Sequence, residues 1–358
     1  MKVRAFITHK MCEQYADCQD RFCINEDNRR IGLSDGMSQS IFPDYWAEIL
    51  SKQYAVEGHC YEEDRKLLCN VWLQRVIKYR NEQIELGKDP WKLDNFLASR
   101  KGAGATICGV YFENATDWKG DVLGDSCIIR VNTKDWTIEI LTSEDKEFDS
   151  FPDFYDSYPE KLGRGNIMSF EGRISPENIL LLVSDPFSEY IAKNKENAKE
   201  LIEQIQRLSN HEDFCELVDD WRVKGMHNDD STLCVIEFDG DINMNVEHQD
   251  DISILMKEEK KEEKVEISGV QNEALLNEES SEHKIADTIE KKDSKEIKTS
   301  QSSDLQAFFY KVIKELDTLI SKFNKKKSFL KRDNIKKHDI MEIRKRLIKE
   351  YEKLTTTE

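Results

Sequence analysis

The chain of 358 residues has a formal net charge of -18 at pH 7, and 38% of its residues are hydrophobic. This length allows one good-sized core together with a small second element or a tail. The acidic balance argues against a general nucleic-acid binder, because phosphate contacts require a surplus of Lys and Arg. A cation or a basic partner suits this charge better.

The nine cysteines are scattered and form no CxxC pair, so neither a zinc site nor a disulfide framework is indicated. The N-terminal stretch "MKVRAFITHKM" lacks the apolar run of a signal peptide. No segment approaches the ~20 apolar residues that a membrane span requires. These features predict a cytoplasmic protein without a membrane attachment.

Strand-like and helix-like patterns alternate up to about residue 240. Short β-branched or aromatic runs predict strands at residues 3–8, 20–25, 29–34, 105–112, 126–132, 136–141, 178–184 and 231–238. Apolar residues spaced three and four apart predict helices at residues 44–55, 62–85, 196–209 and 211–225. Because several strands are separated only by turn-length gaps, antiparallel hairpins are expected rather than βαβ crossovers. The sequence thus predicts a layered domain over residues 1–240 in which helices cover antiparallel sheets.

The composition changes at residue 241. Residues 241–303 are dominated by Glu, Lys, Ser, Asp and Asn, and they cannot bury enough apolar surface to offset the chain entropy, so a disordered linker is expected. Within residues 304–354, two helical apolar stripes flank the basic stretch "NKKKSFLKRDNIKK". This pattern predicts a helical hairpin that docks on a protein partner, with nucleic-acid binding as the alternative.

Aspartates stand at the ends of several predicted strands. Asp20 opens one strand, Asp35 and Asp185 close two others, and Asp229 and Asp230 open the last. A single Asp at a strand end is most often a turn or cap residue. Several brought together would repel one another unless a cation lay between them, and oxygen ligands suit Mg²⁺ or Mn²⁺. Two such ions can activate water and stabilise the oxygens of a phosphoryl displacement, which suggests hydrolysis of a phosphate ester.

Six ordered motifs resemble the bacterial type of the metal-dependent type 2C protein serine/threonine phosphatase family. They are "CQDRF", "GLSDGMSQS", "GAGATICGVYF", "VLGDSCIIRV", "LLLVSDPFSEYI" and "NDDSTLCVIEF", and together they span roughly residues 1–240. The resemblance implies an α+β fold, a four-layer α-β-β-α sandwich of antiparallel sheets flanked by helices, with the C-terminal helical element added to it. It also implies a signalling enzyme that dephosphorylates phosphoserine or phosphothreonine in proteins, with a co-encoded kinase as a candidate partner.

The resemblance also assigns ligands for two Mg²⁺ or Mn²⁺ ions. Asp20 would bind one metal and Asp35 would bridge both. The glycine after the bridging carboxylate, Gly36, allows a sharp turn and lets its carbonyl approach the other metal. Asp185 and Asp229 would complete the coordination of the first metal, directly or through water.

Further residues match supporting positions of the family. Asp125 would hold a third, weaker ion together with Asp185. Thr106 and Thr232 match positions that support the strands beside the site. Residues 143–166 lie where the family has a variable flap that influences substrate choice.

The chain departs from the family pattern in three places. Ser38 stands in the stretch that is usually glycine-rich, and Pro186 replaces a glycine. No arginine occupies the usual place before Asp20 for holding the substrate phosphate, so Lys10 or Arg21 would take this role. These departures support a second hypothesis, a catalytically weak phosphatase-like scaffold that binds a phosphorylated partner and uses the C-terminal helices as an interaction module.

Overall fold

The computed structural model describes residues 1–143, 152–158, 160–161 and 163–259. The chain divides into two compact units, Met1–Ile267 and Ser268–Glu358. The predicted helical hairpin, most of the predicted linker and part of the predicted flap lie outside the described residues. Only the first unit is described below.

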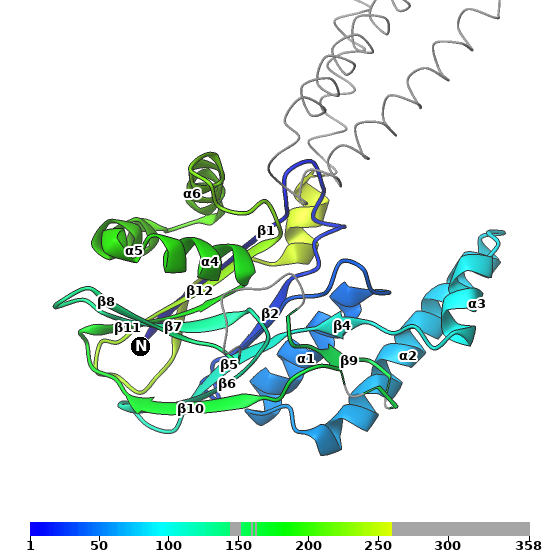
Figure 1. Cartoon of the computed structure of the whole chain (residues 1–358), viewed down its shortest axis with the longest axis horizontal. Coiled ribbons are helices and arrows are strands. Elements are labelled where there is room, and N and C mark those ends of the chain that lie inside the picture. Colours follow the sequence, from blue (N-terminus) through cyan, green and yellow to red (C-terminus); the bar gives the residue numbers. More distant parts are fainter. Residues whose placement is uncertain (144–151, 159, 162, 260–358) are drawn as a thin grey trace, which may run out of the picture. The chain divides into compact units, whose positions relative to one another are not determined.

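Two sheets stack against each other through a shared core (Figure 1). The first has the order β13-β1-β12-β11-β7-β8. Its strands are β1 (Lys2–Thr8), β7 (Cys127–Asn132), β8 (Thr137–Leu141), β11 (Asn178–Val183), β12 (Ser231–Glu237) and β13 (Asn245–Gln249). The second has the order β10-β6-β5-β3-β2. Its strands are β2 (Arg21–Asn25), β3 (Arg30–Ser34), β5 (Ile107–Phe112), β6 (Asp117–Leu123) and β10 (Met168–Arg173).

Strand β11 shows how one strand serves two cores. Successive side chains of a strand point to opposite faces. Leu180 and Leu182 accordingly pack into the core between the two sheets, whereas Leu181 and Val183 pack toward the helices on the outer face. All four are fully buried, which explains why this strand is a continuous apolar run rather than an alternating one.

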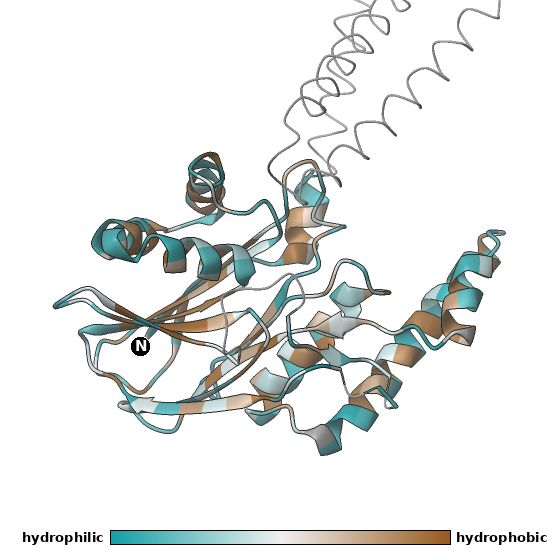
Figure 2. Cartoon of the chain, viewed as in Figure 1, coloured by the Kyte–Doolittle hydropathy of each residue, from teal (hydrophilic) through white to brown (hydrophobic). Residues whose placement is uncertain are grey.

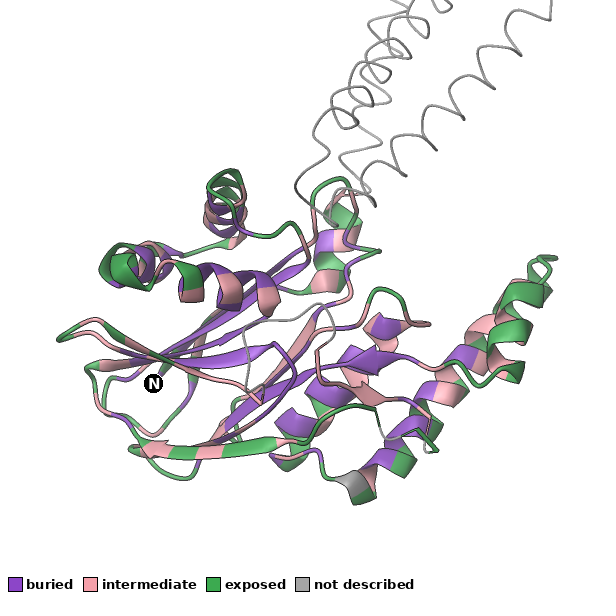
Figure 3. Ribbon diagram, viewed as in Figure 1, coloured by how far each residue is buried: buried purple, intermediate pink, exposed green. Residues whose placement is uncertain are grey.

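Helices cover the outer face of each sheet (Figure 1). Those over the first sheet are α4 (Asp185–Lys193), α5 (Ala198–Arg207) and α6 (His211–Val223), with the 3-10 turn η1 (Lys195–Asn197) between α4 and α5. Those beside the second are α1 (Pro43–Glu57), α2 (Glu62–Glu85) and α3 (Trp91–Ala98). Figure 2 shows hydrophobic residues concentrated along the central strands, and Figure 3 shows these strands buried, whereas β10 is largely exposed. The predicted four-layer α-β-β-α sandwich is confirmed.

The close contact between α1 and the second sheet requires glycine. A Cβ atom on Gly109 would lie 2.3 Å from the ring of Tyr54, and one on Gly32 would lie 2.4 Å from the Ser51 carbonyl oxygen. Helix α1 can therefore lie directly on β3 and β5 only because these strands carry no side chain at the two positions. Residues 35–42 connect β3 to α1, so this contact also fixes the position of the segment that follows Asp35.

All predicted strands and helices of residues 1–240 are present, but several other elements were not predicted, among them the short strand β9 (Tyr155–Asp156), which pairs with β4 (Gly104–Ala105). Strands β6 and β10 contain Gly, Lys and Glu among their apolar residues, which weakens the alternating pattern. Helices α3 and α4 were not predicted either. Strand β13 lies inside the segment expected to be a disordered linker.

The predicted domain boundary at residue 240 is therefore wrong. Strand β13 pairs in parallel with β1, residues 252–259 are helical, and Leu255 is buried beside Ile7 and Cys18. A polar strand can be held by backbone hydrogen bonds to a sheet edge without a strong apolar pattern of its own, which is why the composition did not reveal it. Among the described residues no helix is both long enough and apolar enough to span a membrane.

Shortening the chain tests the revised boundary. A chain ending at residue 240 loses β13 together with the buried Met244 and Leu255, so its free energy of unfolding should fall by about 3 kcal/mol or more relative to the full chain. A chain ending at Ile267 should keep the stability of this unit. Urea titration followed by tryptophan fluorescence measures both values, and equal midpoints for the two shortened chains would contradict the boundary.

Candidate metal centre

Five aspartates from separate segments of the chain form one electrostatic cluster. Asp20 precedes β2, Asp35 follows β3, Asp125 lies in the turn between β6 and β7, Asp185 begins α4, and Asp229 lies before β12. Each of the other four charges raises the pKa of Asp35. The structure therefore brings together all five aspartates that the resemblance assigned to metals.

Strand register explains why these residues meet. Arg21 pairs with Ser34 across the β2–β3 hairpin, so Asp20 just before β2 and Asp35 just after β3 lie at the same end. On the first sheet, Val183 of β11 pairs with both Leu233 of β12 and Cys127 of β7. The segments that carry Asp185, Asp229 and Asp125 thus also meet at one end of their sheet.

Asp20 is the most deeply enclosed of these side chains. It is fully buried, and its Oδ2 accepts a hydrogen bond from Thr232 Oγ1 at 2.8 Å. Burial and the charge of Asp230 raise the pKa of the Asp20 carboxyl to about 7, although hydrogen bonds from Thr232 and Ser184 act in the opposite direction. Its Oδ1 is buried and has no hydrogen-bond partner in the described part of the chain. Such an oxygen is costly unless a cation or water satisfies it.

The pKa values of Asp35 and Asp185 are raised for the same reasons. Burial, followed by the charges of Asp20, Asp185, Asp125 and Asp229, raises the pKa of Asp35 well above its usual value. Burial, followed by Asp125, Asp229 and Asp20, does the same for Asp185. All of these groups ionise together only if positive charge compensates them.

Thr106 holds the backbone of Asp35 in place. The Asp35 amide donates to Thr106 Oγ1 at 3.0 Å, and the Thr106 amide donates to the Asp35 carbonyl at 2.9 Å. Thr106 Oγ1 also lies 2.7 Å from Ser126 Oγ in the turn that carries Asp125. These contacts connect two of the aspartate-bearing segments through a single threonine.

Gly36 is required by packing as well as by the turn. It forms an isolated bridge with Ala105, and a Cβ at this position would lie 2.8 Å from the backbone of Pro43 at the start of α1. Any larger residue would therefore push α1 away from the cluster. Metal binding by the Gly36 carbonyl remains a prediction.

The two candidates for holding a substrate phosphate lie in different surroundings. Lys10 Nζ is 3.7 Å from Asp229 Oδ1, at the edge of the cluster. The Arg21 guanidinium instead donates to the carbonyls of Cys18 and Asp20 and pairs with Asp44 at 3.3 Å. Arg21 thus braces the start of α1, and Lys10 is the better placed of the two for a phosphate role.

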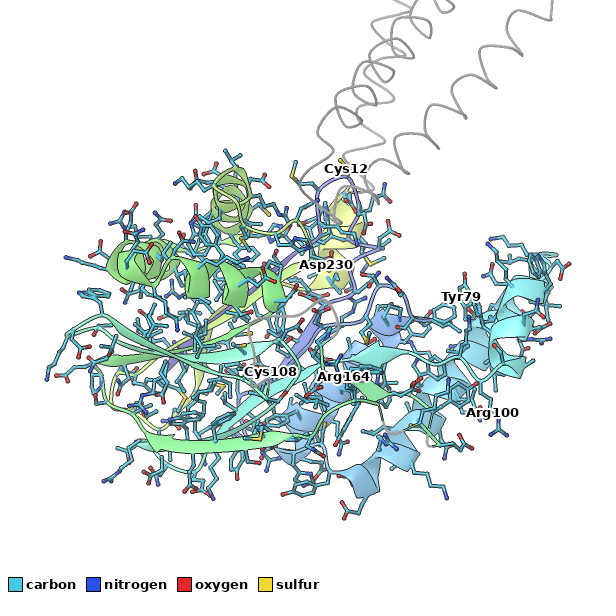
Figure 4. All side chains as sticks on the ribbon, in the orientation of Figure 1. Cys12, Tyr79, Arg100, Cys108, Arg164 and Asp230 are labelled. Atoms are coloured by element: carbon cyan, nitrogen blue, oxygen red, sulfur yellow. The ribbon has the colours of Figure 1, made fainter. Side chains whose placement is uncertain are left out.

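Two features of the cluster were not predicted. Asp230 accepts from the amides of Lys10 at 3.0 Å and Gln19 at 2.7 Å, so one carboxylate closes the loop of residues 9–20 (Asp230 is labelled in Figure 4). Its position beside Asp229 was the only signal in the sequence. The stretch "SDPFSE", in which Pro186 departs from the family pattern, begins helix α4, where a proline suits the first turn.

The oxygen donors of the cluster suit a Mg²⁺ or Mn²⁺ ion that keeps part of its water shell rather than an ion enclosed by protein ligands alone. In the parts of the chain that the structure describes, no three His, Cys, Asp or Glu side chains converge tightly enough to enclose an ion by themselves. Mg²⁺ typically keeps several waters and is held by one or two carboxylates. The buried, unsatisfied Asp20 Oδ1 and the mutual repulsion around Asp35 supply the oxygen donors and the negative charge that such an ion needs.

A pocket of about 570 Å³ opens beside the segment that follows Gly36. Its walls come from the 37–42 segment, α2, α3, residues 101–104 and the described part of the predicted flap. Its apolar lining comprises Met37, Ile41, Phe42, Tyr79, Leu93, Phe96 and Phe154. Lys92, Lys101 and Lys161 also line it, and none of them pairs with a carboxylate within the described residues. The pocket thus combines an apolar lining with three cations, in a chain that is acidic overall.

The fold and the cluster define an α-β-β-α sandwich with a carboxylate site at one end of its sheets. No family model matches the sequence, and no curated protein matches it. The structure is similar to solved bacterial serine/threonine phosphatases. Stp1 from Staphylococcus aureus is 16% identical, and the aligned region covers 66% of this chain and 94% of Stp1, with a TM-score of 0.42.

Two further solved phosphatases show a similar degree of likeness. PstP from Mycobacterium tuberculosis is 14% identical and covers 66% of this chain and 97% of its own, with a TM-score of 0.42. The S. agalactiae serine/threonine phosphatase is 15% identical, and the aligned region covers 66% of this chain and 98% of that phosphatase, with a TM-score of 0.41. Because these TM-scores lie below 0.5, the function proposed below rests on the residues of this chain.

The raised carboxyl pKa values predict a pH-dependent stability. The folded protein without metal holds protons more tightly than the unfolded chain, so the stabilisation is fully present below about pH 4 and is lost as the pH rises through about 7, the pKa of Asp20. At about pH 8 the substitution Asp35→Asn should therefore raise the free energy of unfolding of the metal-free protein, on the order of 2 kcal/mol.

Denaturant titration in the presence of a chelator measures this effect. Asp27→Asn is the matched control, because Asp27 is exposed at the opposite end of the same β2–β3 hairpin and should leave the stability unchanged. Added Mn²⁺ should stabilise the wild type more than Asp35→Asn. A loss of stability in metal-free Asp35→Asn would contradict the proposed repulsion.

Proposed function

We propose that this protein hydrolyses phosphoserine or phosphothreonine in proteins, with Mg²⁺ or Mn²⁺ as its cofactor. The observation that supports this most is the burial of mutually repelling aspartates from separate strand ends, one of which has an unsatisfied oxygen. Such a site is unfavourable without a cation. Paired hard cations held by carboxylates suit displacement at phosphorus.

The aspartates divide the work of holding the cations. Thr232 holds the side chain of Asp20, and Asp185 is placed by the start of α4. The charges of Asp20 and Asp185 both raise the pKa of Asp35, so Asp35 interacts with each of them. Asp229 completes this set, while Asp125 and Asp185 form a pair suited to a third, weaker ion. When bound, the ions supply a water of lowered pKa and neutralise the phosphate oxygens.

Lys10 contributes positive charge at the edge of the site. Burial lowers its pKa, but Asp229, Glu13 and Asp230 outweigh this effect and raise it, so the ammonium group stays charged. Its backbone amide is fixed by Asp230, which limits how far the side chain moves. A point charge on a flexible stem can contact a phosphate oxygen, although without the bidentate geometry of arginine.

The pocket beside Gly36 supports a protein rather than a small metabolite as substrate. Its apolar lining would take a large side chain near the phosphorylated residue, and its three lysines favour acidic neighbours. We further propose that the enzyme acts in cytoplasmic signalling. Residues 304–354 would recruit the phosphoprotein or a co-encoded kinase, raising its effective concentration near the site.

Loss of metal-binding carboxylates should abolish turnover. Asp35→Asn and Asp229→Asn should each lower kcat for p-nitrophenyl phosphate with Mn²⁺ by about a hundredfold or more, because the cations lose their ligands. Asp27→Asn, at the far end of the hairpin, should retain full activity. Unchanged activity in Asp35→Asn would exclude this mechanism, and inactive wild-type protein would favour the scaffold hypothesis.

The lysines around the pocket should affect peptides but not small substrates. The double change Lys92→Glu and Lys101→Glu should raise KM for an acidic phosphopeptide by about tenfold, because like charges repel, and leave p-nitrophenyl phosphate turnover unchanged. Lys88→Glu provides the control, since Lys88 is exposed and does not line the pocket. Steady-state kinetics on both substrates distinguishes these outcomes. An equal rise in KM for the double variant and for Lys88→Glu would contradict the assignment of the pocket to peptide binding.

A further inference from the structure

A second group of reactive side chains lies outside the aspartate cluster. Cys215 and His211 are four residues apart on α6, which places them on the same helix face. Cys215 Sγ lies 3.3 Å from His211 Nε2, and His211 Nδ1 lies 2.8 Å from Asp250 Oδ2. Cysteine, histidine and aspartate thus form a continuous chain of polar contacts, as expected for an activated thiol.

The surroundings of Asp250 fix the orientation of the imidazole. Asp250 is buried at the end of β13, where its Oδ2 also accepts from the Ile7 amide at 2.9 Å and its Oδ1 lies 2.8 Å from His248 Nε2. A carboxylate at Nδ1 holds the proton on that nitrogen and leaves Nε2 to accept the thiol proton. Burial lowers the pKa of His211, but hydrogen bonds to Asp250 and Cys215 and their charges outweigh this effect and raise the pKa to about 10, so Nε2 holds a proton firmly once it has taken it from the thiol.

Cys215 differs from the buried cysteines in both contacts and access, and Cys23 shares its intermediate burial. The sulfurs of Cys60, Cys69 and Cys127 donate to backbone carbonyls, and these residues are buried. Cys12 is exposed on the loop of residues 9–20 (labelled in Figure 4). Cys215 is half-buried, so a small reagent can reach a sulfur that already faces an imidazole.

Tyr15 connects this group to the loop that precedes Asp20. Its hydroxyl lies 2.7 Å from His211 Nε2 and 3.9 Å from Cys215 Sγ. Its amide donates to Glu259 in the last described helical segment, and its ring packs edge-on against His9 at 4.6 Å. Tyr15 is buried, so it anchors the whole loop on α6.

We propose that Cys215 is an activated thiol, with His211 as its base and Asp250 as the positioning carboxylate, and that its oxidation by hydroperoxides releases the loop of residues 9–20. This inference goes beyond the proposed phosphatase activity and does not depend on it.

The oxidation step balances with one molecule of hydrogen peroxide. His211 Nε2 takes the thiol proton, and the thiolate attacks one peroxide oxygen. The S–O bond forms as the O–O bond breaks, and the departing hydroxide takes the proton from His211 and leaves as water. The sulfur is oxidised to a sulfenic acid and the peroxide is reduced. The added oxygen occupies the space between Cys215 and Tyr15, whose contact with His211 is only 2.7 Å long.

Site-resolved labelling of the full chain tests the activation. The wild-type protein is treated with limiting hydrogen peroxide, trapped with dimedone and analysed by mass spectrometry, and Cys12 in the same molecule serves as the exposed reference. Cys215 should be labelled about tenfold faster than Cys12, because His211 accepts the proton of Cys215 as the sulfur attacks the peroxide. His211→Gln should remove this difference without changing the rate of Cys12.

Hydrogen exchange tests the connection to the loop. Oxidised wild-type protein should exchange faster over residues 9–20 than reduced protein, whereas Cys215→Ser should show no response to peroxide. Labelling of Cys215 no faster than Cys12 overturns the proposed activation, and this comparison needs no variant to fold. Unchanged exchange over residues 9–20 after complete oxidation overturns the release of the loop.

Discussion

Repulsion among buried carboxylates is the constraint on which this structure depends. Asp20 is buried and Asp35 and Asp185 are half-buried at one end of the two sheets, where desolvation and mutual charge raise the pKa of each. A fold tolerates neighbouring carboxylates of this kind only if other interactions stabilise the folded state or a cation neutralises their charge. The continuous apolar core between the sheets supplies the first, and the oxygen-rich site is suited to the second.

Rigid placement of these groups comes from short polar side chains and backbone pairing. Thr106 fixes the backbone of Asp35, and Thr232 holds the side chain of Asp20. Gly36 lets α1 begin immediately beside the cluster. Each of these supports is a hydrogen bond or a close packing contact, so the fold itself sets the positions of Asp20 and Asp35.

Much of the fold followed from local pattern, and the remainder depends on contacts that local pattern does not contain. The apolar β11 and the amphipathic α2 were predictable, whereas β13 is polar and is held by the edge of β1. The resemblance assigned Asp20 and Asp35 to one site, and the register of the β2–β3 hairpin brings them to the same end. The group around Cys215 was not, since Tyr15, Cys215 and Asp250 come from three distant parts of the chain. Arg21 alternates with Asp20 along the chain and pairs with Asp44.

Strand β13 also shields the fold from self-association. An unpaired strand at a sheet edge offers its free amides and carbonyls to another chain. β1 is a nearly fully buried apolar strand, and β13 covers its outer edge from Lys2 to Ala5 with polar residues such as Glu247. The segment that follows the motifs thus replaces an apolar sheet edge with a polar one, and a polar edge is a poorer template for aggregation.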